Sequence, residues 1–76
     1  MVLKDNGELE NRIAVFRAEK KWSQKEVAQK LGVSRQTVVS LEKNRYNPSL
    51  KLAFQIAELF EKDINEVFQY KGREIE

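Results

Sequence analysis

The stretch from Ser23 to Asn44 (SQKEVAQKLGVSRQTVVSLEKN) constrains the fold more than any other part of the chain. Two serines in it, Ser23 and Ser34, are each placed to cap a helix, and Glu26 completes a capping box with Ser23. Gly32 lies between the two caps and supplies the left-handed residue that ends a helix. The sequence therefore predicts two short helices joined by a tight turn, at about residues 24–31 and 35–44.

The spacing of the apolar residues predicts how these two helices pack. Ala28 is small at the point where the second helix must cross close to the first. The space between the helices is filled by larger apolar residues: Val27, Leu31, Val33, Val38 and Leu41. The opposite face of the second helix is left to four other residues: Arg35, Gln36, Val39 and Ser40. This pattern is typical of the helix-turn-helix, whose second helix enters a DNA major groove.

These residues resemble the Cro/cI-type regulators, also called the lambda-repressor-like or XRE family. The resemblance covers roughly residues 10–68, includes the following segment RYNPSLKLAFQIAELF, and is closest to the short stand-alone members. It implies an all-α domain of five helices, with a short pair of terminal β-strands as an option. We therefore expect one DNA-binding domain over residues 1–76, with a core at 8–68, the helix-turn-helix at 23–44 and a tail at 69–76.

The remaining helices are predicted from apolar periodicity and capping residues. The first helix is expected from about Glu8 to Lys20, with Leu9, Ile13 and Phe16 on its buried face. Ser49 caps a fourth helix, whose buried side is expected to hold Leu50, Leu52, Ala53, Ile56, Ala57, Leu59 and Phe60. Asp63 and Glu66 form a further capping box for a last helix at about residues 64–68.

The tail, residues 69–76, has no helical period. Two alternatives stay open for it: a strand that pairs with residues 2–4 or with a second subunit, and an end without regular structure.

Composition excludes several function classes. The chain has no cysteine and no histidine, so it lacks the thiol nucleophile, the commonest general base and the usual zinc ligands. We expect no enzyme activity, no metal site, no cofactor and no small-molecule ligand. No apolar run approaches the ~20 residues of a membrane span, so we expect a cytoplasmic protein without a membrane partner.

The positive charge is concentrated on the predicted helix pair. Residues 20–47 contain seven lysines and arginines against two glutamates, whereas the whole chain has a net charge of only +2. Such a distribution is typical of one surface that faces nucleic acid.

Four residues on the second helix of the pair are candidates for reading bases. Arginine donates two hydrogen bonds to guanine and glutamine pairs with adenine in the major groove, which favours Arg35 and Gln36 at the start of the helix. Ser40 can bond either base type, and Val39 can pack on a thymine methyl group.

Other residues are expected to contact the DNA backbone. Gln24 lies in the first turn of its helix, where free N–H groups attract a phosphate, and the resemblance implies the same role. Thr37, Asn44, Arg45 and Tyr46 are candidates at the other edge of the recognition helix, and Arg12 is either a phosphate contact or a solvated charge.

The resemblance further implies a structural salt bridge between Arg17 on the first helix and Glu42 near the end of the recognition helix. Such a pair would hold the recognition helix against the first helix. If both residues were instead ordinary surface charges, the pair would contribute only about 0–1 kcal/mol.

One recognition helix reads too few base pairs for useful specificity, so we expect a homodimer on double-stranded operator DNA. The predicted function is sequence-specific transcriptional regulation, by repression at a palindromic operator. The alternative is an antitoxin or adaptor whose main role is to bind another protein. The polar residues at 35, 36 and 40 weigh against it, because a protein-binding surface there would carry large apolar groups.

Overall fold

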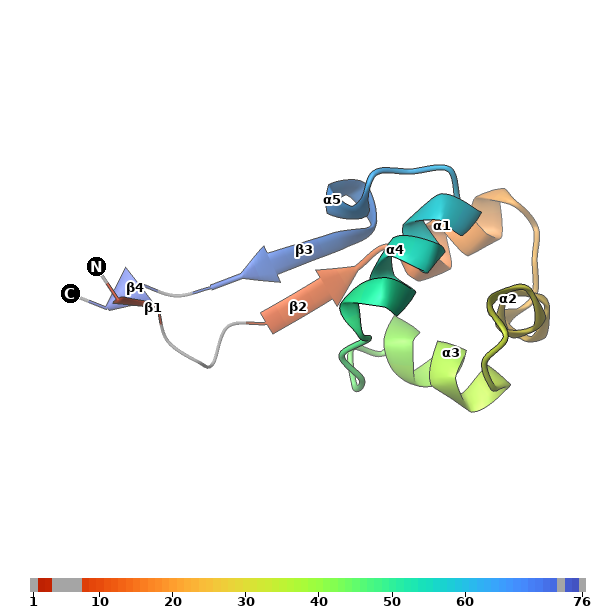
Figure 1. Cartoon of the computed structure of the whole chain (residues 1–76), viewed down its shortest axis with the longest axis horizontal. Coiled ribbons are helices and arrows are strands. Elements are labelled where there is room, and N and C mark those ends of the chain that lie inside the picture. Colours follow the sequence, from red (N-terminus) through yellow and green to blue (C-terminus); the bar gives the residue numbers. More distant parts are fainter. Residues whose placement is uncertain (1, 4–7, 73, 76) are drawn as a thin grey trace.

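A computed structural model describes residues 2–3, 8–72 and 74–75 of the chain. In chain order the elements are β1 (Val2–Leu3), β2 (Glu8–Asn11), α1 (Ile13–Glu19), α2 (Gln24–Leu31), α3 (Arg35–Glu42), α4 (Leu50–Leu59), α5 (Ile64–Val67), β3 (Phe68–Lys71) and β4 (Glu74–Ile75). The five helices form one body, and the strands extend from it as an arm (Figure 1). The fold is mostly helical and of the lambda-repressor type, as the sequence predicted.

Serine side chains fix the starts of three helices. The hydroxyl oxygens of Ser23, Ser34 and Ser49 accept hydrogen bonds from backbone N–H groups three residues later, at 3.0, 3.1 and 3.1 Å. The Ser23 N–H in turn donates to the Glu26 carboxylate at 2.9 Å. The predicted starts of α2, α3 and α4 are therefore confirmed.

The core lies between the helices and is apolar throughout. Its buried residues are Ile13, Phe16, Val27, Ala28, Val38, Leu41, Ala53, Ile56, Ala57, Phe60 and Val67. Phe60 packs its ring against Phe16 and Trp22, with ring centroids 6.1 and 6.0 Å apart. Leu50 was predicted in the core, but it is 70% exposed; as the first residue of α4 it lies ahead of the turns that cross the core.

The first helix is shorter than predicted, because residues 8–11 form strand β2 and not the first turn of a helix. β2 pairs antiparallel with β3, so that Leu9 lies opposite Tyr70 and Asn11 opposite Phe68. The Arg12 N–H donates to the Val67 carbonyl at 2.8 Å. The backbone groups of residues 8–11 thus pair with β3, about sixty residues away in the chain.

A second strand pair joins the two ends of the chain, with Val2 opposite Ile75 and Leu3 opposite Glu74. One alternative left open for the tail, pairing with the first residues, is confirmed for these two positions, and Lys4 lies outside the described residues. The arm gives the molecule its length, with extents of 44 × 22 × 20 Å (Figure 1). Among the helices described, none is long and apolar enough to cross a membrane.

Candidate nucleic-acid interface

A tight turn sets the angle between α2 and α3. Gly32 ends α2 in the left-handed conformation, with φ of +73°, as predicted. The Val33 N–H then donates back to the Ala28 carbonyl at 3.0 Å. Because Ala28 is small and 3% exposed, the two helices approach closely, and the outer face of α3 is left at the surface.

Arg17 and Glu42 join α1 to the end of α3. The Arg17 Nε donates to Glu42 Oε2 at 2.7 Å, and its Nη2 donates to Glu42 Oε1 at 3.1 Å. A third bond runs from Arg17 Nη1 to the Trp22 carbonyl at 3.1 Å. The structure thus brings together the two residues that the sequence suggested as a salt bridge. The hydrogen bonds to Glu42 raise the pKa of Arg17, partial burial opposes this, and the attraction of the carboxylate adds to it.

Gln24 extends this network to the start of α3. Its Nε2 donates to Glu42 Oε1 at 3.1 Å, and its Oε1 accepts from Arg35 Nη2 at 3.3 Å. A continuous chain of polar contacts therefore runs from Arg17 through Glu42 and Gln24 to Arg35. The amide oxygen of Gln24 faces Arg35, the residue expected to read a base.

The four candidate base-reading residues lie on α3 with different degrees of exposure. Arg35 and Gln36 are exposed at its first turn, whereas Val39 and Ser40 are half-buried one turn later. Gln36 Nε2 and Ser40 Oγ are 3.4 Å apart. The two residues with bidentate side chains are therefore the more exposed of the four.

Among the other candidate phosphate contacts, one side chain belongs to a helix cap and three are exposed after the end of α3. Thr37 is half-buried, and its hydroxyl lies 2.9 Å from Ser34 Oγ within the cap of α3. Asn44 is exposed and left-handed, with φ of +57°. Arg45 and Tyr46 are exposed directly after it. These three residues follow the end of α3.

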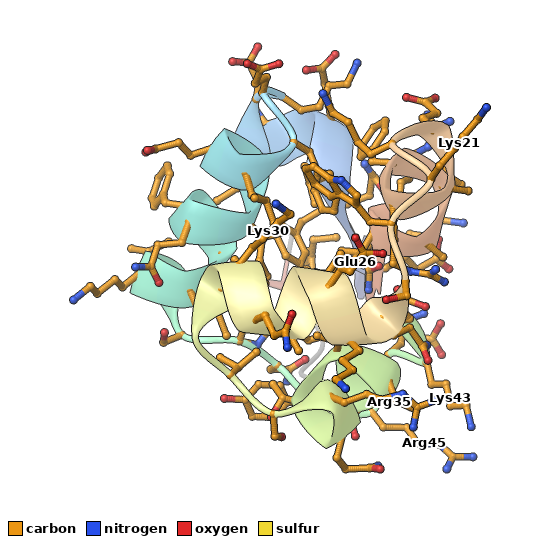
Figure 2. All side chains as sticks on the ribbon, turned by 90° about the vertical axis from the view of Figure 1, so that its right-hand side faces the viewer. Lys21, Glu26, Lys30, Arg35, Lys43 and Arg45 are labelled. Carbon is orange, nitrogen blue, oxygen red and sulfur yellow. The ribbon has the colours of Figure 1, made fainter. Side chains whose placement is uncertain are left out.

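Figure 2 shows Arg35, Lys43 and Arg45 at the lower edge of the molecule, the side on which α3 lies in Figure 1. Part of the positive charge of the helix pair therefore lies on the side of α3, whereas Lys21 and Lys30 lie higher in the same view. Lys43 was not among the predicted DNA contacts, although its position directly after α3 could have indicated it. Arg12 is exposed, and its guanidinium lies 5.5 Å from the ring centre of Phe16.

Sequence reasoning also missed Asn11. Its Nδ2 donates to the Leu41 carbonyl at 2.7 Å and to Asn44 Oδ1 at 2.9 Å. Asn11 lies 30 residues before Leu41 in the chain, so no local pattern pointed to this contact. In the part of the chain that the structure describes, no group of three acidic side chains is placed to hold a metal ion.

Known proteins are similar to this chain in sequence and in fold. A helix-turn-helix family model matches residues 13–67. An uncharacterized HTH-type transcriptional regulator of Methanocaldococcus jannaschii is 46% identical over 66 residues, which cover 87% of this chain and 100% of that protein. Another from Archaeoglobus fulgidus is 45% identical over 67 residues, 88% of this chain and 94% of that one.

The fold is also similar to the crystal structure of the transcriptional regulator VanUg. The two share a TM-score of 0.74 and 19% sequence identity over 96% of this chain and 97% of that one. At this identity the likeness concerns the fold alone. The family match spans α1 to α5, including the helix pair described above. The chain therefore belongs to the XRE-type helix-turn-helix family, a non-enzymatic class of DNA-binding transcriptional regulators.

Proposed function

We propose that the protein is a sequence-specific repressor that binds a palindromic operator as a homodimer, with α3 in the major groove. The observation that carries the proposal is the exposed first turn of α3, where Arg35 and Gln36 point away from the core. Both have the bidentate groups that distinguish base pairs in that groove. Val39 and Ser40 would extend the reading, and Gln24, Thr37, Asn44, Arg45 and Tyr46 would position the protein on phosphates.

The polar network behind α3 supports this role. Groups that read bases must be held in place before binding, because ordering them on the DNA lowers the affinity. The Arg17–Glu42 pair holds the end of α3, and Gln24 holds the Arg35 guanidinium. Occupation of a promoter by such a protein would block transcription, and the protein would act on the nucleoid in the cytoplasm.

An apolar hollow beside the arm supports the homodimer. It is lined by Leu9, Pro48, Leu50, Ala53, Ile64 and Phe68. Leu50 is 70% exposed at its rim, and Phe54, one turn along α4, is 54% exposed. A two-fold interface requires a self-complementary surface. This face provides both a protruding side chain and a recess, and the adjoining hollow is lined by one lysine, Lys62, and by three acidic residues, Glu58, Asp63 and Glu66.

Selection of binding sites from a random duplex library, at physiological salt with competitor DNA, tests the proposal. We expect an enriched inverted repeat with half-site centres about 34 Å apart, or a multiple of that distance. Enrichment of a single unrepeated site would contradict the homodimer. If a folded protein enriches no sequence, operator recognition is wrong, and the exposed face at Leu50 and Phe54 would favour the adaptor function.

A further inference from the structure

Asn11 lies where the arm meets the recognition helix. It is the last residue of β2 and pairs with Phe68 of β3. Its side chain makes three hydrogen bonds: Oδ1 accepts from the Ile13 N–H at 3.0 Å, and Nδ2 donates to the Leu41 carbonyl and to Asn44 Oδ1. The Asn11 amide thus binds both the first residue of α1 and the end of α3.

The orientation of the Asn11 amide follows from chemistry. The Ile13 backbone N–H can only donate, and the Leu41 carbonyl can only accept. Asn11 must therefore direct its oxygen at Ile13 and its nitrogen at Leu41. The same nitrogen faces the Asn44 side chain, so Asn44 must turn its oxygen inward to accept.

This arrangement leaves the Asn44 Nδ2 on the side of the amide that faces away from the Asn11 amide. The end of α3 carries the negative end of the helix dipole, which repels a phosphate. A phosphate there needs donors from side chains. Lys43 and Arg45 on either side of Asn44 are exposed, and Figure 2 shows both at the lower edge of the molecule, the side on which α3 lies.

We propose that Asn11 is a positioning residue for DNA binding: it fixes the Asn44 amide with its nitrogen outward, where it donates to a backbone phosphate. This inference rests on the proposed function, because it assigns a further part of the same interface. The contact would be independent of sequence, since phosphates carry no base information.

A double-mutant cycle tests the proposal. Affinities for the selected operator and for an unrelated duplex are measured with the wild type, Asn11→Ala, Asn44→Ala and the double variant. Each single variant should bind both duplexes about two- to tenfold more weakly, the range expected for one hydrogen bond. The double variant should bind no more weakly than Asn44→Ala.

Because Asn11→Ala also removes the acceptor for the Ile13 N–H, a second variant separates folding from positioning. Asn11→Asp keeps that acceptor but can donate neither to the Leu41 carbonyl nor to Asn44, so its thermal denaturation is measured beside its DNA affinity. The Asn44 amide should turn its oxygen outward and lose the phosphate. Asn47→Asp is the matched control: Asn47 lines the same hollow as Asn44, so this variant adds the same charge nearby. We expect Asn11→Asp to lose more affinity than the control.

The outcomes are distinct. If the losses at positions 11 and 44 simply multiply, or if Asn11→Asp and Asn47→Asp bind equally well, the positioning role is overturned while DNA binding stands. If the wild type binds neither duplex, the proposed function fails first, and the DNA-facing role of Asn44 fails with it.

Discussion

At the scale of single residues, base reading and phosphate contact differ in how their loss depends on sequence. Arg35→Ala and Gln36→Ala should each cost about 1–3 kcal/mol of binding free energy on the selected operator. The loss should largely disappear on duplexes changed at the one base pair that each residue reads. Competition binding against a panel of single-base variants measures this. Equal losses on every duplex would assign the residue to the backbone.

Gln24 should behave differently from Arg35, although the two side chains touch. Gln24→Ala removes the proposed phosphate contact and the support of the Arg35 guanidinium, so we expect weaker binding to every duplex in the same panel. A loss confined to one base pair would show that Gln24 acts through Arg35 alone.

The Arg17–Glu42 pair makes a prediction about stability. The Glu42 side chain is only 9% exposed, and its carboxylate accepts from both Arg17 and Gln24. Glu42→Gln should therefore lower the free energy of unfolding by about 1–2 kcal/mol, measured by thermal or urea denaturation, and should also weaken DNA binding. Glu10→Gln is the control, because the Glu10–Lys71 pair is exposed and should contribute less than about 0.5 kcal/mol. Equal effects of the two substitutions would contradict a structural role for Glu42.

The sign of the Arg17 pKa shift sets the pH range of this contribution. Because the folded pKa is raised above an ordinary value that already lies far above neutral, the stabilisation is fully present below that value. It is lost only as the pH rises past it. Arg17 therefore stays charged between neutral and moderately alkaline pH. The difference in free energy of unfolding between the wild type and Glu42→Gln, measured by urea denaturation, should not change over this range because of Arg17.

At the scale of elements, helices were predictable where their signals are local. Ser23 and Ser34 mark the starts of α2 and α3, Gly32 marks the end of α2, and each lies directly beside the boundary that it marks. β2 was missed because Leu9 fits the apolar period of Ile13 and Phe16, so a longer α1 satisfied the same pattern. The partner that makes residues 8–11 a strand is β3 at the other end of the chain. The bond from Asn11 to the end of α3 was unpredictable for the same reason.

Gly32 gives a prediction about an element boundary. A Cβ atom at this position would meet nothing within 4 Å, while φ is +73°. The cost of a side chain is therefore conformational strain and not a clash. Gly32→Ala should lower the free energy of unfolding by about 1 kcal/mol, and Gly32→Asn by less, since asparagine tolerates this conformation. Equal destabilisation by both variants in urea denaturation would show that the turn opposes any side chain.

At the scale of the whole molecule, the arm and the apolar hollow lie together, and α3 faces another side. Leu9 of β2 and Phe68 of β3 line the hollow together with Leu50 of α4. In the proposed dimer this face would join two copies and leave both recognition helices free. The spacing of the half-sites would then be set by this face and not by α3 itself.

Leu50→Glu tests that arrangement without disturbing the core, because the side chain is 70% exposed. The buried charge should separate the two copies, so sedimentation equilibrium should report a monomer. Affinity for the inverted repeat should fall sharply, whereas affinity for an isolated half-site should stay at the wild-type value. Val15→Glu on α1 is the control, since Val15 is 44% exposed and is absent from the lining of this hollow. If Leu50→Glu remains dimeric, the interface lies on another face. If it is a monomer that binds the repeat as tightly as the wild type, operator binding does not depend on dimer formation.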